Sequence, residues 1–188
     1  MKTKEYNITL KSSWKDISIG EYQQITRLGD DIKNTEFIAI LSNLTKEETQ
    51  DLSLEVIESI MEEFDFFFDS EPPVSPIEPL RTQKYEWELL KDVKQMTASQ
   101  FIDLVELTKD KDKITDNLHL IISTIVEKKK IGWLWNTSIP YRDRDIMEDA
   151  KYIQKHFPIN HALSMSSFFL TILETSQINI EDYLEVNN

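Results

Sequence analysis

The 188-residue chain contains no cysteine and only three glycines. Without cysteine, neither a disulfide bond nor a cysteine-ligated zinc site can form, and the composition fits a reducing compartment. Three glycines are too few for a phosphate-cradling loop. The chain also has no dinucleotide-binding, GxSxG or HExxH pattern. These absences exclude the enzyme classes that depend on such motifs.

Long apolar runs are also absent. The longest apolar stretch, Phe168 to Leu173, is far shorter than the run of about 18 residues that indicates a membrane-spanning helix. The first six residues are charged and are followed by an alternating stretch, which is not the pattern of a signal peptide. We therefore expect a protein that is made without export and has no membrane partner.

Basic residues are few, because 21 Lys and Arg face 34 Asp and Glu, giving a formal net charge of −13. Such a field repels phosphate backbones, so we expect no nucleic-acid partner. The densest basic run is Lys128, Lys129 and Lys130. We interpret it as a solvated helix end, where cations suit the negative end of the helix dipole. Phosphate binding is the alternative for this run.

The residues that usually carry catalysis or bind metals are poorly placed. His119 lies among apolar neighbours, as a core histidine does, and His156 and His161 flank Pro158, which interrupts the helical spacing of a metal-binding pair. The paired carboxylates occur in predicted turns or on solvated helix faces. The sequence therefore predicts no catalytic residue, no cofactor, no metal site and a protein that is not an enzyme.

Two segments repeat one pattern at a constant offset of 79 residues. Residues 6–10 and 85–89 both alternate apolar and polar side chains, which predicts a half-buried strand. Each is followed by an amphipathic stretch that predicts a helix, and then by a second apolar stretch. The pattern therefore predicts a strand–helix–helix unit that occurs twice.

Matched capping boxes mark the first helix of each copy. Ser18 and Glu21 have the required S/T-x-x-E/Q spacing, and Thr97 and Gln100 have it at the equivalent positions. In this motif the hydroxyl accepts from a backbone N–H three residues on, and the Glu or Gln side chain reaches back. We expect helices to begin at both sites.

The predicted fold is mostly α with minor β (α+β). Residues 1–68 form the first repeat, 69–81 a proline-rich linker, 82–130 the second repeat, and 131–188 a C-terminal helical segment that packs on the repeats. The prolines prevent helix and favour a stiff, extended chain. A PxxP ligand for an SH3-like domain is the alternative reading of the linker.

Three further helices are predicted from apolar periodicity, over residues 54–66, 144–156 and 159–175. Aromatic residues gather near the ends of these segments and after the only mid-chain glycine. They are candidates for contacts with a partner, because desolvated Trp and Phe dominate binding energy; ordinary core packing is the alternative. The candidate partner-binding residues are Trp133, Trp135, Phe66, Phe67, Phe68, Phe168 and Phe169.

Two stretches, Trp14–Ile25 (WKDISIGEYQQI) and Ile38–Glu48 (IAILSNLTKEE), resemble small acidic proteins encoded in the structural modules of tailed phages. Those of Bacteroides-infecting, crAss-like phages are the most similar, and many are labelled tail-assembly-chaperone-like. The resemblance covers roughly residues 5 to 68 well. The linker and Trp133–Trp135 have no counterpart in it.

The resemblance implies a non-enzymatic virion structural or assembly protein, found in the virion or in the host cytoplasm during assembly. Its implied partners are other phage structural proteins of the tail, neck or portal, or a second copy of itself. Two alternatives stay open. One is a tail-assembly chaperone absent from the mature particle, and the other is an acidic inhibitor, or DNA mimic, of a host enzyme.

Overall fold

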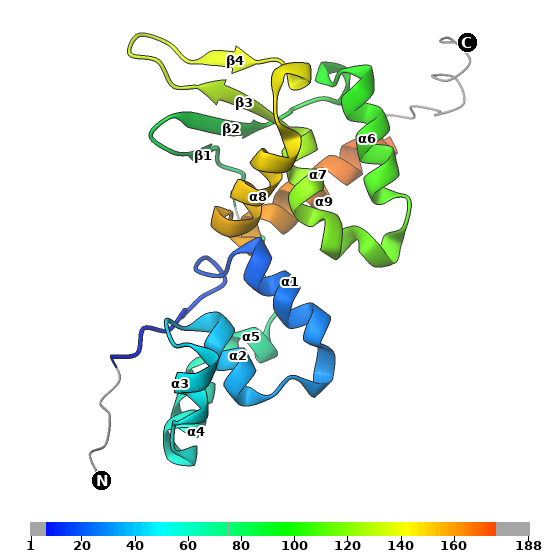
Figure 1. The fold of residues 1–188 in the computed structure, drawn as a ribbon. Coiled ribbons are helices and arrows are strands. Elements are labelled where there is room, and N and C mark those ends of the chain that lie inside the picture. The colour runs from blue at the N-terminus through cyan, green and yellow to red at the C-terminus, as the bar shows by residue number, and fades with distance from the viewer. Residues whose placement is uncertain (1–6, 75, 176–188) are drawn as a thin grey trace.

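The structure, a computed structural model, describes residues 7–74 and 76–175. It is mostly helical with one small antiparallel sheet, which confirms the predicted α+β class. Figure 1 shows helices α2 to α5 at one end, the sheet at the other, and α1, α7, α8 and α9 between them. The helices are α1 (Ile19–Leu28), α2 (Asn34–Leu41), α3 (Lys46–Gln50), α4 (Leu54–Glu63), α5 (Asp65–Asp69), α6 (Ala98–Thr108), α7 (Ile114–Ile125), α8 (Ile146–His156) and α9 (Ile159–Thr175).

The sheet is an antiparallel meander of four strands in the order β1-β2-β3-β4. The strands are β1 (Leu80–Arg81), β2 (Tyr85–Leu89), β3 (Val126–Lys130) and β4 (Thr137–Ile139). The β2 strand has the bounds that its alternating pattern predicted. Because β2 and β3 are central, the outer edges of the sheet belong to the two shortest strands.

The interpretation of the lysine run as a helix end is wrong. Helix α7 ends at Ile125, and the next residue already belongs to β3, so Lys128 to Lys130 lie in a strand. Lys129 is opposite Glu86 on one side and Ser138 on the other. Partners far away in the sequence stabilise this strand, although lysine has a low intrinsic preference for strands.

Both predicted capping boxes are present. Glu21 N donates to Ser18 Oγ at 3.3 Å, and Ser18 N donates to Glu21 Oε2 at 2.8 Å. In the second copy, Gln100 N donates to Thr97 Oγ1 at 3.3 Å and Thr97 N to Gln100 Oε1 at 2.9 Å. The two helices therefore begin with the same hydrogen-bond geometry.

The strand predicted for the first copy is reduced to a single bridge. Tyr6 lies outside the described residues, and over residues 7–10 the structure has only the antiparallel bridge between Leu10 and Ser42. The equivalent pair in the second copy is Leu89 and Val126, which opens the full β2–β3 ladder. Leu89 is 79 residues after Leu10, so the two residues occupy the same position in the repeat. In the first copy this position forms a single bridge, and in the second copy it belongs to a ladder of five residue pairs.

A matched backbone hydrogen bond accompanies these bridges. Lys11 N donates to Leu41 O at 3.1 Å, and Leu90 N donates to Ile125 O at 3.0 Å. In both copies the acceptor is the last residue of the second helix. Helix α2 has 8 residues and α7 has 12, so the second copy has about one more helical turn. Residues 70–79 contain no helix or strand where the structure describes them.

The two copies share one hydrophobic core. Ile38 and Leu41 on α2 are fully buried, as are Leu118 and Ile121, which follow them by 80 residues and lie on the longer helix α7. Helix α1 packs against α7, α8 and α9 as well as α2. The buried Gln23 on α1 joins these helices, because its amide donates to Thr115 O at 2.7 Å and its oxygen accepts from Gln154 at 2.6 Å. The C-terminal helices therefore complete the core.

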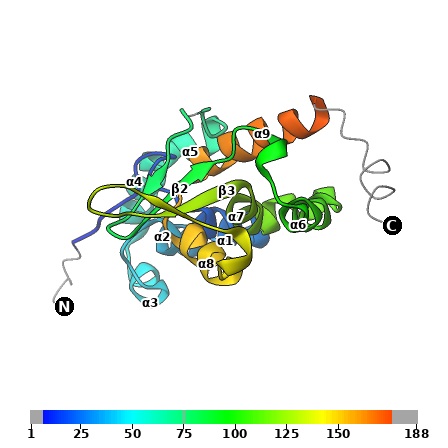
Figure 2. The same cartoon turned by 90° about the horizontal axis from the view of Figure 1, so that it is seen from above.

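Helix α9 has the predicted bounds, whereas α8 begins two residues later than predicted, at Ile146. The predicted helix over 54–66 is divided into α4 and α5 at Phe64. Figure 2, viewed from above, shows α9 along one side of the molecule and α8 on the other. Among the described helices, none is both long and apolar enough to cross a lipid bilayer.

Candidate protein-binding hairpin

A β-hairpin formed by β3 and β4 extends from the core (Figure 1). Its first strand continues directly from α7, because Ile125 ends the helix and Val126 starts the strand. Val126 is fully buried. The hairpin is therefore oriented by a core helix without a flexible connection.

The lysines of β3 are bound to neighbouring acids. Lys129 Nζ lies 2.5 Å from Glu88 Oε2 and 3.2 Å from Glu127 Oε2. The hydrogen bond from Lys129 lowers the pKa of the Glu88 carboxyl, and the same bond raises the pKa of Lys129. Lys128 Nζ lies 2.5 Å from Asp149 Oδ1 and 4.1 Å from the centre of the Tyr85 ring. Two of the three lysines therefore hold β3 in place.

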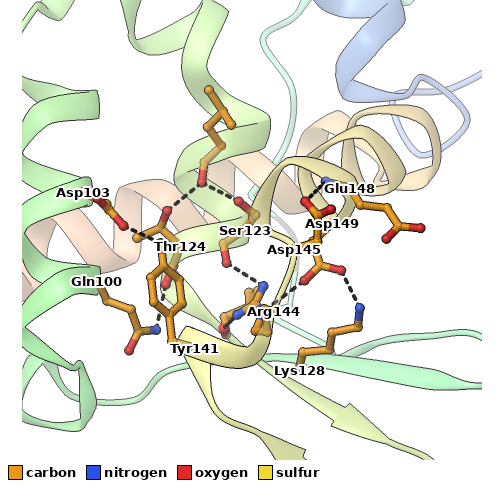
Figure 3. Close-up of polar contacts among 12 residues, drawn as sticks. Gln100, Asp103, Ser123, Thr124, Lys128, Tyr141, Arg144, Asp145, Glu148 and Asp149 are labelled. Atoms are coloured by element: carbon orange, nitrogen blue, oxygen red, sulfur yellow. Dashed lines mark hydrogen bonds and ion pairs between the residues drawn. The ribbon is translucent and has the colours of Figure 1, made fainter.

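Arg144 anchors the base of the hairpin (Figure 3). Its Nε donates to Asp149 Oδ2 at 2.9 Å, Nη1 to Val126 O at 2.7 Å, and Nη2 to Ser123 O at 2.8 Å. The guanidinium therefore connects the chain after β4 to α8, to the first residue of β3 and to α7. Asp149 also accepts from Lys128, so one buried carboxylate is paired with two cations.

Tyr141 fixes the same end of the hairpin to α6. Its hydroxyl donates to Asp103 Oδ2 at 2.8 Å. Burial, followed by this hydrogen bond, raises the pKa of Tyr141 to about 12. Beside it, Gln100 Nε2 donates to Thr124 O at 3.1 Å, as Figure 3 shows. The hairpin base is thus bonded to three helices.

A cavity of about 340 Å³ lies between this base and β2. Its lining includes Glu88, Lys91, Lys129 and Arg144, and each of these charged groups has an ion-pair partner. The geometry here is that of a support for the hairpin.

The tip of the hairpin is apolar and exposed. Trp133 is 98% exposed, Trp135 is 72% exposed, and Leu134 between them is also exposed. A Cβ added at Gly132 would lie 2.3 Å from Trp135 O, so only glycine allows this close turn. Ile131 N donates to Lys84 O at 2.9 Å, which joins the start of the tip to the β1–β2 turn.

The other predicted contact residues lie elsewhere. Phe169 is 1% exposed and belongs to the core, where a partner has no access to it. Phe66 and Phe67 pack on the core, with ring centres 5.8 Å and 4.7 Å from that of Trp14. Phe68 and Phe168 are exposed, on α5 and α9. The structure therefore does not gather the predicted aromatic residues into one surface.

Sequence reasoning missed the anchoring residues Arg144, Asp149 and Tyr141. Arg144 stands between two aspartates in the sequence, which is typical of an exposed turn. Asp145 is an N-cap, since its carboxylate accepts from Glu148 N at 3.0 Å, and this spacing was the available signal for the start of α8. Within residues 7–74 and 76–175, no group of three or more His, Asp or Glu side chains is arranged to hold a metal ion.

Comparison of the chain with protein-family models, with curated proteins and with solved structures finds no match.

Proposed function

We propose that the protein is a non-enzymatic structural or assembly protein of a tailed phage, which docks onto tail, neck or portal proteins through its hairpin tip. The observation that carries this proposal is the pair Trp133 and Trp135, exposed at the end of a hairpin whose base is bonded to the core. The sequence resemblance of Trp14–Ile25 and Ile38–Glu48 supports the phage context.

The tip has the properties of a binding hot spot. Tryptophan is enriched among residues whose removal costs at least about 2 kcal/mol of binding energy. The bonds made by Arg144, Lys128 and Tyr141 order the hairpin before binding, so less conformational entropy is lost on association. Large exposed apolar side chains that lie side by side in this way mark interaction sites.

The test is crosslinking mass spectrometry on purified phage particles. We expect the protein in the particle, with crosslinks from Lys130 and Lys84, beside the tip, to a tail, neck or portal protein. Replacing Trp133 and Trp135 with alanine is expected to reduce incorporation at least about 30-fold. The matched control is Leu54→Ala, which removes another exposed apolar side chain. Equal incorporation of both variants would refute the proposed docking site.

The same experiment separates the two assembly roles. A protein present in infected cells and absent from purified particles is a tail-assembly chaperone. One that remains in particles after washing is a virion component.

An acidic inhibitor or DNA mimic is the second candidate. It is favoured by residues 45–79, which contain eleven acidic residues and one basic residue. Glu55, Glu58 and Glu62 are exposed along one face of α4. Binding to a host nucleic-acid enzyme that weakens steeply with salt, and survives removal of both tip tryptophans, would favour this function over the first.

A further inference from the structure

A groove runs between the proline-rich segment and α9. It has a volume of about 580 Å³, and its lining includes Tyr22, Val74, Ile77, Leu163 and Phe168. Val74 is 92% exposed, so apolar surface is open to solvent along this groove. The volume lies in the range of pockets that enclose small ligands or side chains.

A second cavity continues the groove toward the sheet. Its volume is about 220 Å³, and Ile77 and Phe168 line both cavities. The remaining lining includes Glu78, Leu89 and Leu90. The two cavities together form one apolar channel beside the end of β2 that contains Leu89.

The wall formed by the proline-rich segment is held at both ends. Ser70 Oγ accepts from Trp14 Nε1 at 3.4 Å and donates to Phe66 O at 2.8 Å. At the other end, Leu80 pairs with Trp87 in the sheet. Prolines stiffen the chain between these points, so the groove is present before any partner binds.

The groove has an acidic rim. Glu71 lines it, and Glu78, Glu88 and Lys91 line its continuation, where Lys91 is paired with Glu88. Burial, and then the charge of Glu71, raises the pKa of the Tyr22 hydroxyl. The segment that forms this wall belongs to residues 45–79, with eleven acidic residues and one basic residue. A ligand for this groove should therefore be apolar with basic flanks.

The hairpin tip has that chemistry. Trp133, Leu134 and Trp135 are exposed apolar side chains, and the exposed Lys84 and Lys130 flank them. Residues 126–144 contain five basic and two acidic residues, which makes the hairpin the basic part of an acidic chain. The tip and the groove are thus apolar surfaces whose surroundings carry opposite charge.

One copy cannot place its own tip in its own groove. The tip follows Lys130, which pairs with Tyr85 at the first residue of β2. The groove continues beside Leu89 and Leu90, at the other end of that strand. The tip therefore points away from the groove along β2, in agreement with Figures 1 and 2, where the β3–β4 loop projects away from α9.

We propose that the tip of one copy binds the groove that Glu71, Pro72, Val74 and Ile77 form with α9 of a second copy. This inference rests on the proposed function in taking the tip as the contact surface, and only a tip left free at the end of an assembly can then dock onto a tail, neck or portal protein. The contact proposed is heterologous, with each tip in the groove of the next copy, so that repetition gives a closed ring or an open filament. The Lys84 and Lys130 ammonium groups lie against the Glu71 and Glu78 carboxylates of the neighbour.

The test mixes two variants, each of which retains one surface. The tip variant is W133A/W135A, and the groove variant is V74K/F168K, which places positive charge where the basic tip would dock. Analytical ultracentrifugation of the wild-type chain should show association beyond the dimer, weakening as salt rises. Each variant alone should associate at least about 30-fold more weakly. An equimolar mixture should stop at a one-to-one heterodimer.

Several outcomes would overturn the inference. These are a wild-type chain that stays monomeric at about 100 μM, one that stops at dimers, and a groove variant that associates like wild type. Circular dichroism shows whether each variant folds. If the double groove variant does not fold, the single variant Val74→Lys replaces it in the mixing experiment. A monomeric chain that crosslinks to tail, neck or portal proteins refutes self-association and leaves the proposed function standing. A monomeric chain whose tip instead binds anionic lipid vesicles refutes both.

Discussion

Arg144 and Asp149 form an ion pair, with Nε and Oδ2 2.9 Å apart, in which the side chains are only 1% and 3% exposed. Several other polar contacts at the hairpin base involve one member of this pair. Lys128 reaches the second oxygen of the same carboxylate, and Arg144 donates to two main-chain carbonyls. The position of the hairpin therefore depends on one buried, fully bonded charge cluster.

Replacing Arg144 with methionine should lower the free energy of unfolding by about 3–5 kcal/mol, because it leaves a buried carboxylate with one partner and two carbonyls without a donor. Urea unfolding followed by circular dichroism measures this. The control is Arg142→Met, because Arg142 forms an exposed pair with Asp143 at 3.6 Å, and such pairs contribute about 0–1 kcal/mol. Similar losses for both variants would contradict the anchoring role.

The Tyr141 hydroxyl should make stability depend on alkaline pH. The folded pKa of about 12 lies above the ordinary value of 10.0, so between these values the folded chain keeps a proton that the unfolded chain loses. Stability therefore falls as pH rises from about 10 to 12. In Tyr141→Phe this decline should be less steep, as measured by urea midpoints at several pH values. The raised pKa of Tyr22 affects wild type and Tyr141→Phe equally, so it cancels in the comparison. Parallel curves of stability against pH for the two proteins would contradict the prediction.

His119 should make stability depend on acidic pH. Burial, and then the charge of Arg27, lowers its pKa below the ordinary 6.5. Gln23 Nε2 lies 3.2 Å from His119 Nδ1, which accepts from it in the neutral tautomer that carries the ring proton on its own Nε2. Since the unfolded chain binds the proton more readily, this contribution is present above pH 6.5 and is lost as pH falls toward the folded pKa.

The comparison for His119 is with His119→Gln, whose side chain can still accept from Gln23. The difference in unfolding free energy between wild type and variant should shrink as pH is lowered from about 7.5 to 5. Titration of the His119 ring protons by NMR gives an independent measurement of the pKa of His119 in the folded chain. A midpoint at or above 6.5 would rule out the buried neutral ring.

The two capping boxes should contribute equally. Ser18→Ala and Thr97→Ala each remove a hydroxyl that accepts from a backbone N–H at 3.3 Å, at a cost of about 1 kcal/mol. Ser59→Ala, at an exposed position inside α4, is the control and should be neutral or slightly stabilising. Urea unfolding measures all three. A large loss of unfolding free energy at one cap and none at the other would show that the two caps do not contribute equally to stability.

Local chemistry was enough to place several elements. The starts of α1 and α6 follow from a hydroxyl with a carboxylate or carboxamide three residues on, and β2 follows from alternation over 85–89. The end of α8 at His156 follows from Pro158. All of these signals lie within a few residues of the structure that they specify.

Features that depend on distant partners were missed. Lys128 and Lys129 are poor strand residues in isolation, and their partners Asp149 and Glu88 are 21 and 41 residues away. Arg144 is buried only because α7 and β3 present carbonyls to it. In the first copy, Leu10 has the strand pattern, but the chain after Ser42 turns into α3 rather than continuing beside it. The sequence alone identified Trp133 and Trp135 as candidate partner-binding residues, but it did not predict that they lie at a hairpin tip.

The direct passage from α7 into β3 has a mechanical consequence. A pull on the tip along the strands is carried straight into the core helix, because no hinge lies between Ile125 and Val126. Since such a pull draws β3 and β4 together, the rungs that join β3 to β2 bear the load in shear instead of opening one at a time. A molecule coupled through this hairpin would yield at a single high-force event, with the tip and the core failing as one unit.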